Sequence, residues 1–474
     1  MVARVQSGFG SLALSPALLA VVGELGYAQP TPIQAAAIPA LLAGRDVLGR
    51  SKTGSGKTAA FALPILQGVD LGTRSVQALV VCPTRELCAQ VAREVRKLGR
   101  GHAGLAVLEL VGGQPARPQR EALARGVHVA IGTPGRLLDH LQREALDPRS
   151  IQTAVLDEAD RMLDMGFEED VNRILRALPS SRQTVLFSAT FPSAIAAMSR
   201  KYQSDALLVT IDEKDGAPGI QQLRLAVEPA EKVRALSWLL GEYPNESALV
   251  FCNFKATVAE LTGTLDAAGL SVGRLDGDLD QFHRDQVLAR FRNQSLRVLI
   301  ATDVAGRGID VQGLDLVINF ELPPTPEIYV HRIGRTGRAG RKGVAISLTT
   351  NPVDERIAAA EQLTGTHIEA LAWKPGGPGI KALLKGIARG PKMETLLISG
   401  GRKDRVRPGD ILGALTGESG GLQASDVGQI EVRQTLSYVA VSSRVSSRAV
   451  ARLNQGRIKG KRFRVTLVGS AARP

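Results

Sequence analysis

The fold of this 474-residue chain is constrained most by short apolar runs that alternate with longer helical stretches. In the first half, these runs predict buried strands at residues 78–82, 127–131, 154–156 and 184–187. Such spacing is typical of βαβ units, in which helices join parallel strands. We therefore expect a parallel sheet with helices on both faces.

The alternation returns after a polar, turn-forming segment at residues 211–219, which we predict to be a linker. The second block predicts strands at residues 248–252, 272–275, 297–301, 316–320 and 343–348, with a helix over 282–292. A break rich in Pro and Gly follows at 374–379, and we expect the basic stretch up to residue 391 to be a flexible arm. A second α/β lobe is thus expected after the first.

The final 80 residues or so predict the order β, α, β, β, α, β. The strands are expected at residues 395–399, 430–432, 438–441 and 462–468, and the helices after Arg407 and from Ser447 to Gly456. This order is ferredoxin-like and is the layout of an RNA recognition module.

The positive charge of the chain lies almost entirely in this tail. Lys and Arg outnumber Asp and Glu by 59 to 46, which gives a net charge of +13. Residues 375–474 hold 18 basic and 6 acidic side chains, whereas the first 374 residues hold 41 and 40. The tail is therefore expected to bind an anionic partner.

Composition excludes several other classes of protein. With 44% hydrophobic and 22% charged residues, wholesale disorder is excluded. The three cysteines show no CxxC spacing, so we expect buried core thiols and neither a disulfide framework nor zinc. The most apolar early stretch, residues 12–22, is too short to span a membrane and has no signal-peptide pattern. A cytoplasmic protein without membrane contact is expected.

Residues 51–58, Ser-Lys-Thr-Gly-Ser-Gly-Lys-Thr, follow an apolar run and precede a helical stretch. Glycines let backbone N–H groups face phosphate oxygens, Lys57 supplies a cation for the β and γ phosphates, and Thr58 offers a hydroxyl to Mg²⁺. Ser51 stands where the full P-loop pattern has Gly. The phosphate-binding residues are predicted to be Thr53, Gly54, Ser55, Gly56, Lys57 and Thr58.

About 100 residues further on, an apolar run ends in Asp157 and Glu158. A parallel sheet brings its strand ends to one edge, so Asp157 can hold Mg²⁺, directly or through water, beside the P-loop. Glu158 is then placed to orient and deprotonate the attacking water. An acidic strand end alone is usually a solvated helix cap; together with Lys57 and Thr58 it predicts an NTPase site.

Three motifs carry a family resemblance. Asp-Glu-Ala-Asp at 157–160, Ser-Ala-Thr at 188–190 and His-Arg-Ile-Gly-Arg-Thr-Gly-Arg at 331–338 closely resemble the DEAD-box RNA helicases, over residues 9 to about 348. The resemblance implies ATP, RNA and an α/β fold of two RecA-like parallel-sheet lobes, followed here by the small α+β ferredoxin-like domain. The expected parts are a Q-motif-bearing ATP-binding lobe (1–210), a linker (211–219), a C-terminal lobe (220–373), a basic linker (374–393) and an RNA-binding domain (394–474).

The resemblance also implies roles within the ATP site. Gln34 would read the adenine edge and Phe9 would stack over it, although core packing is an open alternative for Phe9. The arginine cluster suits anion clamping, and Arg335 and Arg338 would reach the γ-phosphate as fingers from the second lobe. For Arg332 and Arg341 the alternative is plain surface charge.

Coupling between the lobes is assigned to Asp160, Ser188, Thr190 and His331. Ser188 and Thr190 resemble the motif that links hydrolysis to strand separation, but hydroxyls at a strand end can equally be turn caps. Asp160 and His331 could bond across the cleft in the closed state.

The predicted RNA contacts of the core fall near strand ends and suit the gripping of a backbone. They are Thr84, Arg85, Gly113, Thr133 and Arg136 in the first lobe, and Arg284, Thr302 and Arg307 in the second. Gly308 and Asp310 would face the nucleotide.

Residues 400–417 and 458–465 resemble the C-terminal domain of the DbpA subgroup of these helicases. The resemblance implies binding to a hairpin of 23S ribosomal RNA and action during assembly of the large subunit. Because Tyr438 is the one aromatic residue on the expected central strands, we do not expect stacking on the sheet face to dominate. The predicted contacts are Arg402, Lys403, Arg405, Lys459, Lys461 and Arg462, for which a solvated basic face is the alternative.

Three other functions remain open at this point. A DNA translocase of the same superfamily is disfavoured by Gln34, Asp160 and the His331-Arg332 pair. An ATP-dependent RNA clamp with little unwinding would use the same closed state. The last domain could instead bind proteins. We expect a monomer, but the oligomeric state stays open, since no heptad pattern occurs and the pairing edge of the last sheet is not readable from the sequence.

Overall fold

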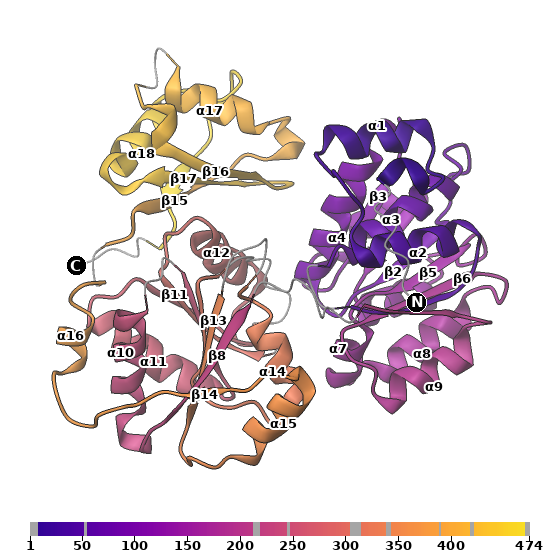
Figure 1. The fold of residues 1–474 in the computed structure, drawn as a ribbon. Coiled ribbons are helices and arrows are strands. Elements are labelled where there is room, and N and C mark those ends of the chain that lie inside the picture. The colour runs from indigo at the N-terminus through magenta and orange to yellow at the C-terminus, as the bar shows by residue number, and fades with distance from the viewer. Residues whose placement is uncertain are drawn as a thin grey trace. The chain divides into compact units, whose positions relative to one another are not determined.

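The computed structural model describes residues 8–51, 55–211, 219–243, 247–303, 314–337, 343–387, 390–417 and 421–469. The chain divides into two compact units. The first contains the N-terminal α/β lobe, and the second contains the other α/β lobe and the C-terminal domain (Figure 1).

The first lobe has a parallel seven-stranded sheet in the order β3-β4-β2-β5-β6-β1-β7. The strands are β1 Val47–Arg50, β2 Ala78–Val81, β3 Val107–Leu110, β4 Val129–Gly132, β5 Thr153–Leu156, β6 Gln183–Ser188 and β7 Leu207–Thr210. The four predicted strands correspond to β2, β4, β5 and β6, while β3 and β7 were not predicted. Because the central strands are buried on both faces, they read as nearly unbroken apolar runs.

Helices cover both faces of this sheet and build a hydrophobic core on each side. They are α1 Pro16–Glu24, α2 Pro32–Leu42, α3 Lys57–Gly68, α4 Arg85–Leu98, α5 Ala116–Ala124, α6 Pro134–Gln142, α7 Ala159–Asp164, α8 Glu168–Ala177 and α9 Ser193–Tyr202. Since α3, α4, α6 and α7 begin just after β1, β2, β4 and β5, the predicted motifs come to one sheet edge.

The second lobe repeats the architecture, with a parallel sheet in the order β10-β11-β9-β12-β13-β8-β14. The strands are β8 Ile220–Ala226, β9 Ala248–Cys252, β10 Val272–Leu275, β11 Val298–Thr302, β12 Leu316–Asn319, β13 Gly343–Thr349 and β14 Glu369–Ala370. The helices are α10 Lys232–Glu242, α11 Lys255–Ala267, α12 Gln281–Arg292, α14 Pro326–Ile333, α15 Glu355–Thr364 and α16 Ile380–Leu383. All five predicted strands and the predicted helix are present.

The segment after the second lobe is packed rather than free. Trp373 lies 5.3 Å from Trp238 between ring centroids, and Leu384 is fully buried in the core of the lobe. The expectation of a flexible arm is therefore wrong for residues 380–387, because this stretch covers apolar surface of α10. Most of the predicted linker, residues 212–218, lies outside the described residues.

The C-terminal domain has the predicted ferredoxin-like order, with an antiparallel sheet arranged β16-β17-β15-β18. Its elements are β15 Met393–Ile398, α17 Pro408–Thr416, β16 Val427–Val432, β17 Ser437–Ser442, α18 Ser446–Gln455 and β18 Val465–Leu467. Short 3₁₀ turns occur at Phe9–Ser11, Gly99–Gly101, Pro229–Glu231, Arg402–Asp404, Ala424–Asp426 and Ser443–Val445. Helices α17 and α18 cover one face of this sheet (Figure 1).

The other face of this small sheet contacts α12 of the second lobe, within the same unit. Asn293 Nδ2 donates to Thr395 Oγ1 at 3.1 Å, and Ser295 Oγ lies 2.7 Å from the same oxygen. Thr395, on β15, is 1% exposed. Because a buried hydroxyl needs partners, these contacts explain why a polar residue is tolerated at the centre of the sheet.

Candidate ATP and RNA sites

The described part of the P-loop lies against α2. Gly56 has a φ of 93°, and a Cβ at this position would lie 2.4 Å from Gln34 Nε2. Gln34 Nε2 donates to the Gly56 carbonyl at 3.1 Å, and its Oε1 accepts from the Thr31 N–H at 2.9 Å. The glycine therefore allows Gln34, the predicted adenine reader, to pack on the phosphate loop. Thr53 and Gly54 lie outside the described residues.

Lys57 and Thr58 form the first turn of α3, directly after the loop. Lys57 is 6% exposed, and its Nζ donates to the Ser51 carbonyl at 2.9 Å. Ser51, which departs from the usual glycine, also hydrogen-bonds Ser55 through its hydroxyl. A buried cation at a helix N-terminus, where backbone N–H groups also point outward, is suited to polyphosphate.

Asp157 follows β5 and is 3% exposed. Its Oδ1 has no hydrogen-bond partner among the described residues. Burial raises the pKa of this carboxyl to about 6, although the nearby Lys57 acts in the opposite direction. A buried carboxylate oxygen without a partner fits a cation site, because a cation would offset the desolvation cost.

Glu158 has a left-handed backbone with a φ of 54°, which is uncommon for a residue with a side chain. Its carboxylate forms a buried ion pair with Arg161 on α7. Sequence reasoning missed Arg161, although its position three residues after Glu158 is one helical turn away. The predicted catalytic base is thus held by an internal cation.

Asp160 is hydrogen-bonded to the 188–190 motif, and both were predicted to couple the two lobes. Its Oδ2 accepts from the Ala189 N–H at 3.0 Å, the Thr190 N–H at 2.8 Å and Thr190 Oγ1 at 2.9 Å. Ser188 Oγ donates to the Thr190 carbonyl at 2.6 Å. These bonds link the start of α7 to the loop after β6. His331, the predicted partner of Asp160, lies on α14 of the other unit.

Phe9 is 5% exposed and belongs to the core of the first lobe. Its ring stands edge-on to Tyr27, with 6.1 Å between centroids. The hydroxyl of Tyr27 donates to Glu94 on α4. Of the two readings left open by the sequence, core packing is the one present in this conformation.

The predicted RNA contacts of the first lobe gather where β2, β3 and β4 end. Thr84 caps α4 by accepting from the Leu87 N–H at 3.2 Å. The guanidinium of Arg85 lies so close to Gly113 that a Cβ there would be 1.9 Å from Nη1. Gly113, with a φ of 70°, is therefore required for this approach.

Arg136 belongs to the same edge, one turn into α6 after Thr133. Its guanidinium donates to the Gln114 carbonyl at 3.2 Å and to Gln119 Oε1 at 3.0 Å. Gln119 also lies 2.9 Å from Nε2 of His140, a fully buried ring whose pKa is lowered by burial and by Arg136. Gln119 was not predicted, because nothing in its local pattern distinguishes it from other helical glutamines.

Arg332 is a buried structural residue, so surface charge is the wrong reading for it. It is 1% exposed, and its guanidinium donates to both carboxylate oxygens of Asp303 at 2.6 and 2.7 Å. It also donates to Asn253 Oδ1 at 2.8 Å and to the Glu321 carbonyl at 2.6 Å. Such bidentate pairing of a buried Arg holds the loops after β9, β11 and β12 together.

Some of the other predicted residues of the second lobe lie in described segments, and the rest do not. Arg284 lies on α12, Thr302 ends β11 with 7% exposure, and Arg335 follows α14 with 5% exposure. The residues outside the described part of the chain are Arg307, Gly308, Asp310, Arg338 and Arg341.

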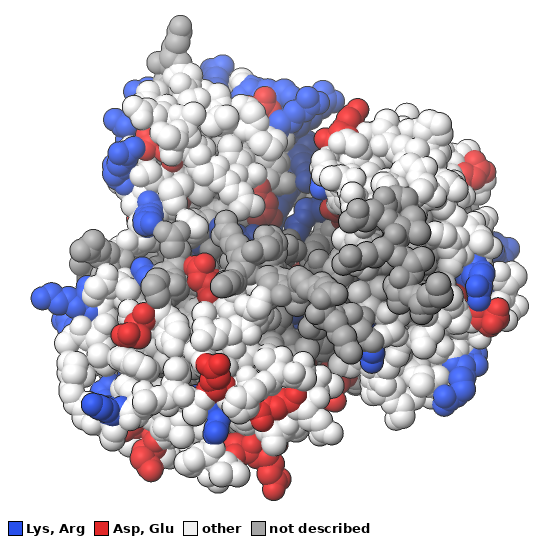
Figure 2. All heavy atoms as spheres, viewed as in Figure 1, with Lys and Arg blue, Asp and Glu red and all other residues white. Residues whose placement is uncertain are grey.

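The predicted basic residues of the C-terminal domain lie on two loops that touch. Lys459 Nζ donates to the Arg405 carbonyl at 3.1 Å, which joins the 402–405 turn to the 459–462 loop. The side chains of Arg402, Lys403, Arg405, Lys459, Lys461 and Arg462 are all exposed. Lys and Arg side chains gather around this domain on the face drawn in Figure 2.

Tyr438, at the centre of β17, is covered rather than open. It is 1% exposed, and Arg433 lies over its ring at 5.2 Å from the centroid. Arg433 pairs with Asp285 on α12, and nearby Glu431 pairs with Arg292 at 2.8 Å. The α12 contact therefore occupies the sheet face, in line with the expectation that stacking there is not the main binding mode.

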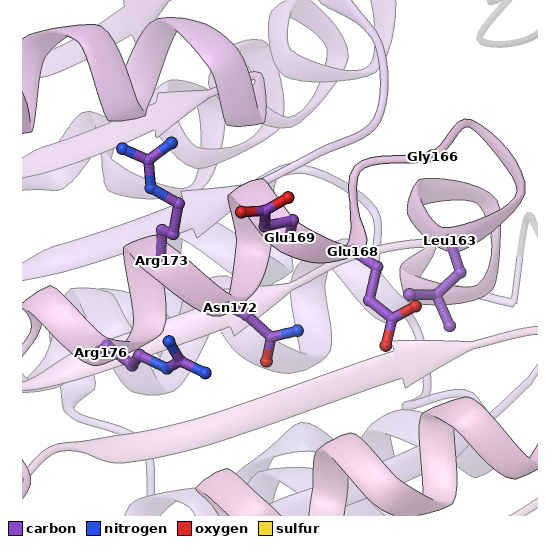
Figure 3. A pocket seen from close by; sticks show the side chains of 7 residues that line it. All are labelled: Leu163, Gly166, Glu168, Glu169, Asn172, Arg173 and Arg176. Carbon is purple, nitrogen blue, oxygen red and sulfur yellow. The ribbon is translucent and has the colours of Figure 1, made fainter.

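A hollow of about 530 Å³ lies on α7 and α8, away from the predicted sites. It is lined by Leu163, Gly166, Glu168, Glu169, Asn172, Arg173 and Arg176 (Figure 3). Because its acidic and basic side chains are mixed and none was predicted to bind nucleotide or RNA, we assign it no role.

The geometry agrees with comparisons against known proteins. The DEAD/DEAH box helicase model matches residues 31–198, the helicase conserved C-terminal domain model matches 231–340, and the DbpA RNA binding domain model matches 395–467. The chain is therefore an ATP-dependent RNA helicase of the DEAD-box family, and its two parallel-sheet lobes are RecA-like.

Individual relatives place the chain more specifically within the family. The chain is 47% identical to the ATP-dependent RNA helicase DbpA of Escherichia coli, over 96% of this chain and 98% of that protein. It is 44% identical to the helicase CshA of Bacillus cereus, over 77% of this chain and 69% of that one. The structure of Saccharomyces cerevisiae Dbp5 bound to RNA and ADP BeF3 matches with a TM-score of 0.71 at 34% identity, over 77% of this chain and 95% of that one. The chain belongs to the DbpA group.

No helix in the described segments is long and apolar enough to cross a membrane. All three cysteines are buried, as expected for core thiols.

Proposed function

We propose that this helicase is directed by its C-terminal domain to a hairpin of 23S ribosomal RNA in precursors of the large ribosomal subunit, where it unwinds RNA locally. The observation that carries the proposal is the pair of touching basic loops, 402–405 and 459–462, in a domain that matches the DbpA RNA-binding model. Two exposed basic loops fixed side by side can follow the phosphates of a folded RNA. We further propose that the protein acts in the cytoplasm as a monomer.

In the ATP site, we propose that Lys57 and the phosphate-loop residues hold the β and γ phosphates, with Gln34 on the adenine edge. Mg²⁺ fits beside Thr58 and Asp157, because Asp157 offers a buried oxygen with no partner among the described residues. Bound there, Mg²⁺ would neutralise charge that develops on the phosphates. Glu158 would orient the attacking water and take its proton, while Arg161 keeps that carboxylate in place.

Arg335 and Arg338 are proposed to complete the site from the second lobe when the lobes close. Arginine fingers of this kind raise phosphoryl-transfer rates by about 10³ or more. Hydrolysis would then depend on closure, which bound RNA favours through Arg85, Arg136, Arg284, Thr302 and Arg307. We propose that RNA therefore stimulates ATP hydrolysis.

The targeting proposal is tested by the ATPase rate with a panel of RNAs. Deletion of residues 375–474 is a poor test, because Leu384 belongs to the core of the second lobe. The double variant Arg402→Ser, Lys461→Ser keeps that core, whereas Arg448→Ser, Arg452→Ser on α18 removes the same charge elsewhere in the domain.

We expect the loop variant to need at least tenfold more 23S hairpin for half-maximal ATPase, and the α18 variant to resemble the parent. The salt dependence of hairpin binding should flatten by about one unit of slope per cation removed. Equal responses to ribosomal and unrelated RNA in the parent protein would refute the targeting role.

A further inference from the structure

Two phenylalanine rings project from the second lobe where β9 and β10 end. Phe254 is 65% exposed and Phe282 is 47% exposed. They are the only aromatic residues among the exposed large hydrophobic side chains of the described segments. Each ring left in water forfeits about 25 cal/mol for every Å² of apolar surface that stays unburied, so folding does not explain the pair.

The sheet order places the two rings on either side of β11. Strand β11 lies between β10 and β9, Phe254 is the cap residue before α11, and Phe282 is the second residue of α12. The loops that carry them meet, because Lys255 pairs with Asp278 and a Cβ at Gly277 would lie 3.5 Å from Lys255 Cε. Both rings therefore border one surface at the carboxyl edge of the sheet.

The same surface carries groups suited to phosphate. Lys255 follows Phe254 directly and is exposed, and Arg284 stands two residues after Phe282. Thr302 ends β11 between the two rings. Aromatic faces next to cations are the chemistry by which proteins hold single-stranded nucleic acid, with bases on the rings and phosphates on the cations.

We propose that Phe254 and Phe282 form a stacking platform for unpaired bases of the RNA that the second lobe holds by its backbone. The inference rests on RNA binding by that lobe and is independent of the ribosomal target. A base can lie on such a ring only after it has left a duplex stack, whereas backbone contacts are open to paired and unpaired strands alike. The platform therefore favours a separated strand, whatever its sequence.

A protein partner is a less suitable occupant of this surface. Apolar docking sites have a continuous hydrophobic centre with a polar rim. Here the charged pair of Lys255 and Asp278 joins the loops that carry the two rings, and His283 packs edge-on against Phe282 at 5.7 Å between centroids. Separate rings among charged groups match the alternation of bases and phosphates in RNA.

The platform is tested with the full-length protein, a non-hydrolysable ATP analogue and a short unstructured oligoadenylate. One adenine at a time is replaced by 2-aminopurine, whose fluorescence falls when it stacks on an aromatic ring. We expect quenching at one or two positions. It should disappear in Phe254→Leu, Phe282→Leu, which keeps apolar volume, and persist in Phe254→Tyr, Phe282→Tyr.

Affinity provides the second measurement. The double leucine variant should bind the oligonucleotide at least tenfold more weakly, as expected for loss of base stacking on an aromatic ring. Removing the base at the quenched position should weaken binding of the parent protein by a similar factor, and should have no further effect on the leucine variant. Affinity for a blunt duplex should not change.

Leu363→Ala, which truncates a 44% exposed side chain on α15, is the matched control and should behave like the parent. Unchanged quenching and affinity in the leucine variant would overturn the inference. It would also be overturned if the leucine variant bound RNA normally but no longer bound a protein that the parent binds. The oligonucleotide contains no ribosomal sequence. Lys459→Ser, Lys461→Ser should therefore leave quenching intact even if the targeting proposal fails.

Discussion

Two buried carboxylates three residues apart show how environment sets function at the scale of a residue. Asp157 has an oxygen without a described partner, whereas one oxygen of Asp160 accepts three hydrogen bonds. Both are 3% exposed, so burial alone does not distinguish them. We propose that Asp160 stabilises the nucleotide-free lobe and that Asp157 holds a cation that arrives with the nucleotide.

Asp157→Asn should stabilise the nucleotide-free protein at pH 7.5. The pKa of Asp157 is raised by burial from 3.8 to about 6. Its stabilising contribution is therefore complete below pH 4 and is lost as pH rises through 6. The amide should add about 1–3 kcal/mol to the free energy of unfolding at pH 7.5 and much less at pH 5, as measured by urea denaturation. ATP hydrolysis should be abolished.

Asp160→Asn is the matched comparison and should have the opposite effect on stability. Charge-assisted bonds to Ala189 and Thr190 would be weakened, at a cost of about 1–3 kcal/mol. If both substitutions destabilise the protein equally at pH 7.5, burial of the Asp157 carboxylate does not cost stability, which would contradict the raised pKa.

Gly56→Ala should weaken ATP binding at least tenfold. Its φ of 93° is unfavourable for alanine, and the new Cβ would lie 2.4 Å from Gln34 Nε2 and 3.0 Å from Thr31 Oγ1. The side chain proposed to read adenine would be displaced. Equilibrium binding of a fluorescent ATP analogue measures the effect. Gly68→Ala, at the end of α3 where a Cβ would meet no side chain or other segment within 4 Å, should bind ATP normally.

At the scale of elements, the sequence of the first lobe predicts the central strands well and the edge strands poorly. Buried parallel strands such as β2 and β9 are continuous apolar runs. By contrast, β3 contains Glu109 and is partly exposed at the sheet edge, and β7 alternates at the opposite edge. One-sided burial produces a short, interrupted pattern that resembles a loop.

The motifs at 51–58, 157–160 and 188–190 were predictable because each lies at the end of a strand, but the role of Arg332 in the 331–338 motif was not. Spacing alone cannot tell an arginine that faces a ligand from one that faces its own chain. Arg332 bridges Asp303, Asn253 and the Glu321 carbonyl, which lie far apart in sequence. Only the packing of three strand ends reveals the difference.

Arg332→Lys should destabilise the second lobe by about 3 kcal/mol, because a lysine cannot satisfy these acceptors together and leaves Asp303 poorly paired. Urea denaturation measures the loss. Arg356→Lys, which alters the partly exposed pair with Asp354, should cost less than about 1 kcal/mol. Similar losses in both variants would show that the buried network is not what stabilises the lobe.

At the scale of the whole molecule, the basic tail behaves as an addition to the second lobe rather than as a tethered domain. Its strand order and basic loops could be predicted from the sequence. The covered sheet face could not, because Thr395 and Tyr438 occupy positions that an isolated domain would leave open. The face is buried by α12, some 100 residues earlier in the chain.

The ion pair of Asp285 on α12 with Arg433 in the C-terminal domain offers a test of this arrangement. Asp285→Arg would place like charge against Arg433 and Arg292, and Arg433→Asp would place it against Asp285 and Glu431. Each single reversal should release the domain from the lobe, because burying unmatched charge costs several kcal/mol. Release would appear as faster tumbling of a label on the C-terminal domain.

The double reversal restores opposite charges across the contact, so it should recover most of the slow tumbling and of the 23S-stimulated ATPase rate. The same cycle on the exposed pair Arg117 and Glu121 of the first lobe should change neither quantity. If either single reversal leaves tumbling unchanged, the pair does not hold the domain. If the labelled C-terminal domain tumbles faster while the 23S-stimulated ATPase rate stays constant, the domain can bind RNA for the helicase without a fixed position on the second lobe. Recovery of both together would show that the helicase uses its second lobe and its RNA-binding domain as one body.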